Sequence, residues 1–186
     1  MKRKAQIRLA SIFLAGLLAV PAQSAEWQNL IDGSDLDDWK QVGGDARYEV
    51  HDSEIVGYTV ANTPNSFLVT KKEYSDFILE YETRLDAPSN SGVQFRSYVG
   101  DNGIVQGYQV EVDPTYRRFS GGLYDEKRRR WLYPLTRNEK ARDAFRNGDW
   151  NHFRIEAIGH SLRVWVNGTQ TVDMVDDMTA KGFFGL

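Results

Sequence analysis

Three short stretches of the chain carry closely spaced ionisable and amide side chains that could bind or transform a polar ligand. In residues 79–84, 93–98 and 108–113, apolar and polar residues alternate. Such alternation is typical of a β-strand with one face in a core and the other face exposed. On the faces that point away from the core, the three strands then carry polar side chains: Glu80, Glu82, Arg84, Gln94, Arg96, Tyr98, Gln109, Glu111 and Asp113.

We expect these three strands to be neighbours in one antiparallel sheet, with Glu82, Arg96 and Glu111 side by side. A solvated sheet face is usually filled with Lys, Thr and Ser, so carboxylates, Arg and amides on adjacent strands favour a binding surface. Two neighbouring carboxylates can have their pKa values driven apart, so that one acts as an acid and the other as a base. The alternative is a plain cross-strand ion pair between Arg96 and Glu82 on a solvated surface.

The rest of the chain has the pattern of an all-β protein. Residues 151–175 form the clearest hairpins, with tight turns at 159–161 and at Asn167-Gly168. The only expected helix is short and lies within residues 137–147. Many short strands with almost no helix predict an antiparallel sandwich or barrel. We see neither a linker nor an internal repeat, so a single domain is predicted.

The first 25 residues have the features of a secretory signal peptide. Four basic residues precede an apolar run at residues 9–20, and small residues follow Pro21. The run is short for a membrane span. We expect cleavage after Ala25, with Ser24 as the alternative. The predicted product, residues 26–186, is periplasmic or secreted and has no membrane association.

Composition narrows the classes of partner and of chemistry. The chain has a net charge of −3, and four of its 23 Lys and Arg residues lie in the predicted signal peptide, so residues 26–186 carry about −7. This acidity argues against nucleic acid and anionic membranes. The chain contains no Cys, which excludes disulfides and thiolate chemistry. His51, His152 and His160 are poor catalytic candidates, because two occupy turns and the third alternates on another strand.

No His-rich or Cys-rich spacing indicates a metal site. Carboxylates of the polar face could still hold a divalent ion such as Ca²⁺, and so could the turn at residues 32–38. The metal content therefore stays open. No other cofactor is predicted.

Six motifs in order resemble the 3-keto-disaccharide hydrolase domain family, once catalogued as a domain of unknown function. They are LIDGSDLDDW, NSGVQFR, GYQVEVDP, SGGLYDE, WLYP and GDWNHFRIEA. The resemblance covers residues 26–186. It implies an all-β fold with two antiparallel sheets, a jelly-roll sandwich of the concanavalin A-like lectin or glucanase type. The family usually continues past the position of Leu186, so either the sequence is truncated or its last strand is short.

The resemblance also implies an exported hydrolase or lyase that acts on sugars with a ketone at C3. The ketone acidifies the hydrogen on C2, so a base can remove it, the oxygen on C1 can leave, and water can then add. This needs a base, a cation for the enolate and an acid. Glu82 and Glu111 are the base and acid candidates, and Arg96 is the stabilising cation. Supporting contacts to the sugar are expected from Glu80, Gln94, Tyr98, Gln109, Asp113, Tyr124 and Trp131.

Two other functions compete with this one. The same sandwich serves non-catalytic sugar-binding modules, which need aromatic and amide groups but tolerate loss of the carboxylates. It also serves protein-interaction domains, which would expose a large apolar patch; the polar alternation disfavours this. A carbohydrate is thus the expected ligand, and the oligomeric state is not indicated by the sequence.

Overall fold

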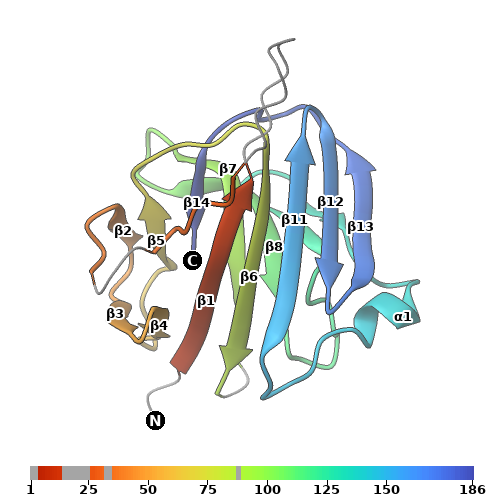
Figure 1. Ribbon diagram of the computed structural model, residues 1–186, viewed down its shortest axis with the longest axis horizontal. Helices are drawn as coiled ribbons and strands as arrows, with labels where there is room; N and C mark the ends of the chain where they lie inside the picture. The colour runs from red at the N-terminus through yellow and green to blue at the C-terminus, as the bar shows by residue number, and fades with distance from the viewer. Residues whose placement is uncertain (1–3, 14–25, 32–34, 87–88) are drawn as a thin grey trace.

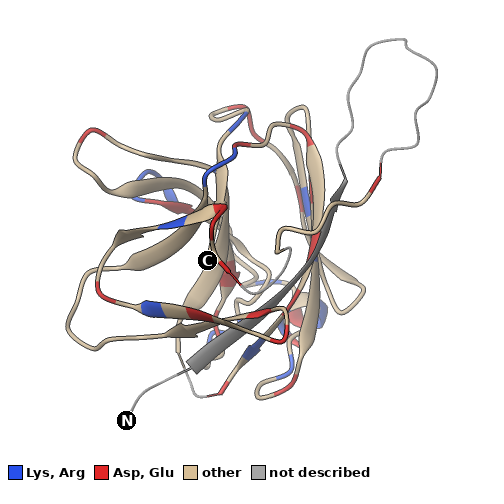
Figure 2. Cartoon of the chain, turned by 60° about the vertical axis from the view of Figure 1, so that its left-hand side comes forward, with Lys and Arg blue, Asp and Glu red and all other residues tan. Residues whose placement is uncertain are grey.

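The chain folds into two antiparallel β-sheets that face each other across a shared core (Figures 1 and 2). The computed structural model describes the backbone of residues 4–13 and, with their side chains, residues 26–31, 35–86 and 89–186. The two facing antiparallel sheets confirm the predicted all-β sandwich. In the described residues, no helix is long and apolar enough to cross a membrane.

One sheet, called the β6 sheet, has seven strands. Their order is β13 (Thr169–Val175), β12 (Ser161–Val166), β11 (Asn151–Ile158), β6 (Phe77–Leu85), β1 (Lys4–Phe13), β4 (Glu54–Tyr58) and β3 (Arg47–His51). Along β6 every second residue is buried, from Phe77 to Leu85, so its apolar face covers the core. The turn between β12 and β13 has positive φ at Asn167 (47°) and Gly168 (78°), as a tight primed hairpin turn requires.

The other sheet, called the β8 sheet, also has seven strands. Their order is β10 (Arg130–Tyr133), β9 (Leu123–Glu126), β8 (Val105–Val112), β7 (Ser91–Val99), β14 (Phe183–Gly185), β5 (Ser66–Thr70) and β2 (Trp39–Gly43). Tyr108, Val110 and Val112 of β8 pack in the core. The alternate residues Gln109 and Glu111 therefore lie on the face that points away from it.

The expected helix is much shorter than the segment predicted for it. Helix α1 covers only Glu139–Arg142, and the side chain of Asn138 caps it by accepting a hydrogen bond (3.0 Å) from the Ala141 amide. Within the described residues it is the only α-helix, and it lies at one end of the β6 sheet (Figure 1). All other positioning of side chains in the described chain comes from strands and loops.

The predicted signal peptide lies partly outside the described residues. Residues 1–3 and 14–25 are not described, whereas Lys4–Phe13 form β1. Strand β1 pairs with β4 through Lys4 and Tyr58, and with β6 through Ala5 and Leu85. Cleavage of the signal peptide after Ala25 stays a prediction.

The expectation that residues 79–84, 93–98 and 108–113 are neighbours in one sheet is wrong. The strands β7 and β8 do pair, with Gln94 opposite Gln109. Strand β6, however, belongs to the other layer of the sandwich. The alternation correctly identified a core face in each strand, but it does not determine the sheet to which a strand belongs.

Candidate functional site

A cavity of about 480 Å³ lies on the face of the β8 sheet that points away from the core. This volume is in the range of small-molecule sites. Residues of β7, β8 and β9 form its floor, and the β3–β4 hairpin with residues 59–65 forms one wall. Arg117 and Trp131 contribute to the opposite side.

Glu111 lies in the floor of this cavity and is 4% exposed. Its backbone is held on the β9 side, because its N–H donates to Gly122 (3.0 Å) and its carbonyl accepts from Gly121 (2.8 Å). On the β7 side its paired residue is Gly92. The paired position on β7 thus carries no side chain, and the amide side chains of Gln109 and Asn90 contact the carboxylate instead.

Amide side chains fix the orientation of this carboxylate. Gln94 donates to Gln109 (2.6 Å), and Gln109 donates in turn to Glu111 Oε2 (3.0 Å). Asn90 donates to the other oxygen, Oε1. Ser97 completes the row by donating to Gln94 (2.8 Å). Each hydrogen bond in this row is donated in the direction of Glu111, so the Gln94 and Gln109 amides both act as donors toward it.

Burial raises the pKa of Glu111 above its usual value, and this is the largest effect on it. The hydrogen bonds from Asn90 and Gln109 oppose this rise, as does the charge of Arg117, while the charge of Asp113 adds to it. A raised pKa makes the ionised carboxylate a stronger base than an ordinary glutamate.

Arg117 is a cation that lines the cavity, and sequence reasoning missed it. Its Nε donates to Asp113 Oδ2 (2.9 Å), and Asp113 is 1% exposed and also accepts from the Thr115 amide (3.1 Å). The guanidinium carbon lies 5.9 Å from the centre of the Trp131 ring. Buried Asp113 therefore holds Arg117 in place. Asp113 itself does not line the cavity, and its expected contact with the sugar stays a prediction.

Two aromatic side chains predicted to contact sugar lie together in the cavity. Tyr124 of β9 and Trp131 of β10 meet edge to face, with ring centres 5.2 Å apart. Phe119 also packs edge to face with Trp131, with ring centres 5.1 Å apart. Both Tyr124 and Trp131 are partly exposed, so each offers ring surface to a ligand. On the opposite wall, Tyr48 and Tyr58 add two more rings.

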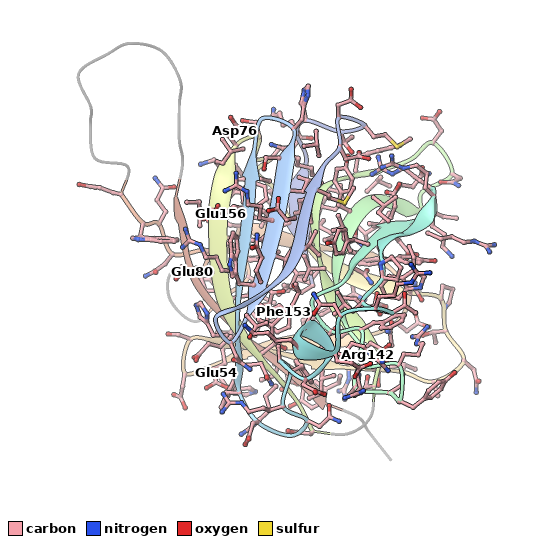
Figure 3. All side chains as sticks on the ribbon, turned by 90° about the vertical axis from the view of Figure 1, so that its right-hand side faces the viewer. Glu54, Asp76, Glu80, Arg142, Phe153 and Glu156 are labelled. Carbon is pink, nitrogen blue, oxygen red and sulfur yellow. The ribbon has the colours of Figure 1, made fainter. Side chains whose placement is uncertain are left out.

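Glu82 and Glu80 are not part of this cavity, and their expected place beside Glu111 is wrong. Both lie on β6 and point to the outer face of the β6 sheet, where Glu80 binds Arg154 (2.5 Å) and lies 3.5 Å from His152. Figure 3 shows Glu80 and Glu156 on this face, and Arg154 bridges the two. These charges form a surface ion-pair ladder.

Arg96 is also outside the cavity, and the prediction that it faces the site with Glu111 is wrong. The pairing of β7 with β8 is irregular between Phe95 and Tyr98, and Arg96 within this bulge has φ of +44°. The bulge redirects its side chain, which is 1% exposed. Its donors bind the carbonyls of Ser75, Ala157 and Gly159 and the carboxylate of Asp76.

The other predicted contacts divide into three groups. Gln109, Tyr124 and Trp131 line the cavity. Gln94 is fully buried below it and supports Gln109. Tyr98 is 38% exposed outside the cavity lining, where its hydroxyl donates to Gln106 (3.3 Å).

Glu126 is a further cavity carboxylate that sequence reasoning missed. It lies on β9, two residues after Tyr124 and on the same face. The alternation in residues 122–126 would have placed both on one face, had the loop been read as a strand. No group of three or more His, Asp or Glu residues in the described chain is arranged to hold a metal ion.

Comparisons with known proteins agree with this architecture. The model of the 3-keto-alpha-glucoside-1,2-lyase-like domain matches residues 26–186. No curated protein matches the chain. Similar solved structures include the carbohydrate-binding module CBM66 of Bacillus subtilis, with 17% identity, a TM-score of 0.54, and coverage of 80% of this chain and 85% of that one.

A protein of Parabacteroides distasonis, provisionally named a glycosyl hydrolase, has 17% identity and a TM-score of 0.60. The match covers 85% of each chain. A second structure with such a name, from the same organism, has 17% identity and a TM-score of 0.53, with coverage of 80% of this chain and 90% of that one. At this identity the likeness concerns the fold.

Proposed function

Because this chain belongs to the family of 3-keto-alpha-glucoside-1,2-lyase-like domains, we propose that it cleaves 3-keto-glycosides by elimination. The observation that carries the proposal is Glu111, a buried carboxylate held by directed amides in the floor of a sugar-sized cavity. The predicted signal peptide supports action in the periplasm or outside the cell.

Glu111 acts as the base. Its ionised carboxylate takes the proton from C2, and the electrons of that C–H bond form an enolate with the C3 ketone. Arg117 lies near enough to Glu111 for its positive charge to lower the pKa of the Glu111 carboxyl. The same charge stabilises the negative enolate oxygen. Loss of the C1 oxygen restores the ketone and leaves a C1–C2 double bond, to which water can add. The outcome is net hydrolysis.

The cavity can also serve a second function, that of a non-catalytic carbohydrate-binding module. The structural likeness to the module CBM66 favours this alternative. Tyr124 and Trp131 would then stack on a sugar ring, and Glu111 and the amides would bind hydroxyl groups. In that case the carboxylate recognises the ligand without exchanging protons.

The test uses purified protein and p-nitrophenyl 3-keto-glucoside, with and without chelator, while released nitrophenol is followed by absorbance. Wild type should release it, and Glu111→Gln should reduce turnover about a hundredfold or more, the scale of lost general base catalysis. The matched control is Glu139→Gln on α1, whose side chain is 65% exposed and does not line the cavity. If the wild-type protein binds the glucoside but releases no nitrophenol, the enzyme proposal is refuted in favour of the carbohydrate-binding module.

A further inference from the structure

The cavity contains a second buried carboxylate, to which the elimination described above assigns no role. Glu126 of β9 is 7% exposed and lines the cavity. Its paired residue on β8 is Gly107, so no side chain lies beside it on that strand. Glu111 and Glu126 thus have similar surroundings, because each is paired with a glycine on the neighbouring strand.

The contacts of Glu126 leave one oxygen available. Asn65 donates to Oε1 at 3.4 Å, and Lys127 Nζ lies 3.8 Å from the same atom. In the part of the chain that the structure describes, Oε2 forms no hydrogen bond. Oε2 is not among the buried side-chain atoms that lack a partner, so it is accessible to solvent or to a ligand in the cavity. Its position in the cavity makes the ligand a natural partner.

The two carboxylates approach the cavity from opposite sides of Tyr124. The β8–β9 register pairs Gln109 with Tyr124, so Glu111 and Glu126 lie at opposite ends of this row. Glu111 lies four positions beyond Gly107 on β8, which corresponds to roughly 14 Å along the strand. Joint action on one sugar ring requires the two side chains to reach toward each other along this row, over Gln109 and Tyr124.

We propose that Glu126 is the general acid, which protonates the leaving oxygen on C1 while Glu111 takes the proton from C2. This rests on the proposed function. In the step, the enolate electrons re-form the C3 ketone and the C1–C2 double bond while the C1–O bond breaks. The freed oxygen takes the carboxyl proton of Glu126 and leaves as an alcohol. Glu111 ends protonated and Glu126 ionised, and exchange with water restores both.

Electrostatics agrees with this assignment. Burial is the largest effect on Glu126 and raises the pKa of its carboxyl, which favours the protonated form that an acid needs. The charge of Lys127 and the hydrogen bond from Asn65 oppose this rise. No cationic side chain in the described part of the chain lies closer to Glu126 than Lys127, which is 54% exposed.

The test compares two substrates that differ in their need for an acid. p-Nitrophenolate leaves as a stable anion, whereas an alkoxide needs a proton, so p-nitrophenyl and methyl 3-keto-glucosides are both assayed. Glu126→Gln should lower turnover of the methyl glycoside about a hundredfold and that of the p-nitrophenyl glycoside by less than about fivefold. Glu139→Gln is again the matched control, and melting curves check folding.

Each outcome decides the assignment. Equal losses on both substrates would show that Glu126 positions the sugar, and no loss on either would show that it is idle; both overturn the inference alone. A wild type that cleaves neither glycoside overturns the proposed function and the inference with it. If Glu126→Gln does not fold, Glu126→Asp keeps the carboxyl but shortens its reach. It should then still impair the methyl glycoside more than the p-nitrophenyl one, and equal impairment would count against the acid.

Discussion

Replacing Arg96 by Met should destabilise the protein without disabling the cavity. The Arg96 side chain is 1% exposed and donates to the carbonyls of Ser75 (2.8 Å), Gly159 (2.8 Å) and Ala157 (3.2 Å). Its fourth partner is Asp76, at 3.0 Å; Figure 3 labels Asp76 near the end of the β6 sheet. These contacts join β7 in one sheet to the residues just before β6, to β11 and to the β11–β12 turn in the other. Met fills a similar volume but donates no hydrogen bond.

The size of the effect follows from what the change leaves behind. Breaking a buried ion pair by removing one partner costs about 3–5 kcal/mol, because the other groups stay buried without compensation. Here Asp76 is 31% exposed and also accepts from the Gly159 amide (2.9 Å), so water and that amide recover part of the loss. We therefore expect about 3 kcal/mol, at the lower end of this range.

Urea unfolding followed by tryptophan fluorescence measures this change. With a slope of about 2 kcal/mol per M, the midpoint should fall by about 1.5 M with the slope unchanged. The control Arg163→Met removes a side chain that is 46% exposed, with carboxylates only at 3.6 and 3.9 Å, and should change stability by less than about 0.5 kcal/mol. An unchanged midpoint, or a folded Arg96→Met protein with turnover reduced a hundredfold, would refute the reasoning and return Arg96 to the catalytic candidates.

Two further predictions concern the cavity. Trp131→Ala should weaken binding of 3-keto-glucose about tenfold or more in titration calorimetry, because the stacking surface is lost. Trp131→Phe keeps an aromatic ring and should recover part of the affinity. Equal affinity in wild type and both variants would remove Trp131 from the site. Glu126→Gln should melt above wild type at pH 7. The native pKa of Glu126 is raised, so the unfolded chain loses its proton first as pH rises, and wild-type stability falls above about pH 4.5. The difference should vanish below about pH 4, and a lower melting point of the variant at pH 7 would contradict the raised pKa.

The fold could be predicted from the sequence because its signals are local. Alternation in β6, β8 and β11 and the Asn167-Gly168 turn indicate strands and hairpins directly. The sandwich then follows, since each strand must bury one face. Which sheet receives each strand depends on contacts between distant residues, and alternation contains no such information.

Four of the predicted site residues line the cavity: Gln109 and Glu111 of β8, and the aromatic residues Tyr124 and Trp131. Glu111 and Gln109 share a face of β8 by simple alternation, and they do line the cavity. Arg96 was misplaced because a bulge changes the side-chain direction that alternation assumes. Arg117 was missed because it lies in a turn, where no periodicity applies, and its approach to Glu111 depends on Asp113.

The position of β1 links the predicted cleavage after Ala25 to the shape of the cavity. Strand β1 lies between β6 and β4, and the β3–β4 hairpin, which includes Tyr48 and Tyr58, joins the β6 sheet by hydrogen bonds through β1. Cleavage after Ala25 would remove this strand and leave two unpaired edges facing each other across the width of one strand, about 10 Å. The hairpin would then be anchored by core side chains such as Ile55 and by the hydrogen bond from the Tyr48 hydroxyl to the Leu186 carbonyl (3.4 Å). Maturation would thus loosen one wall of the cavity, while Glu111 and Glu126 on the β8 sheet and Arg117 in the connection between β8 and β9 stay in place.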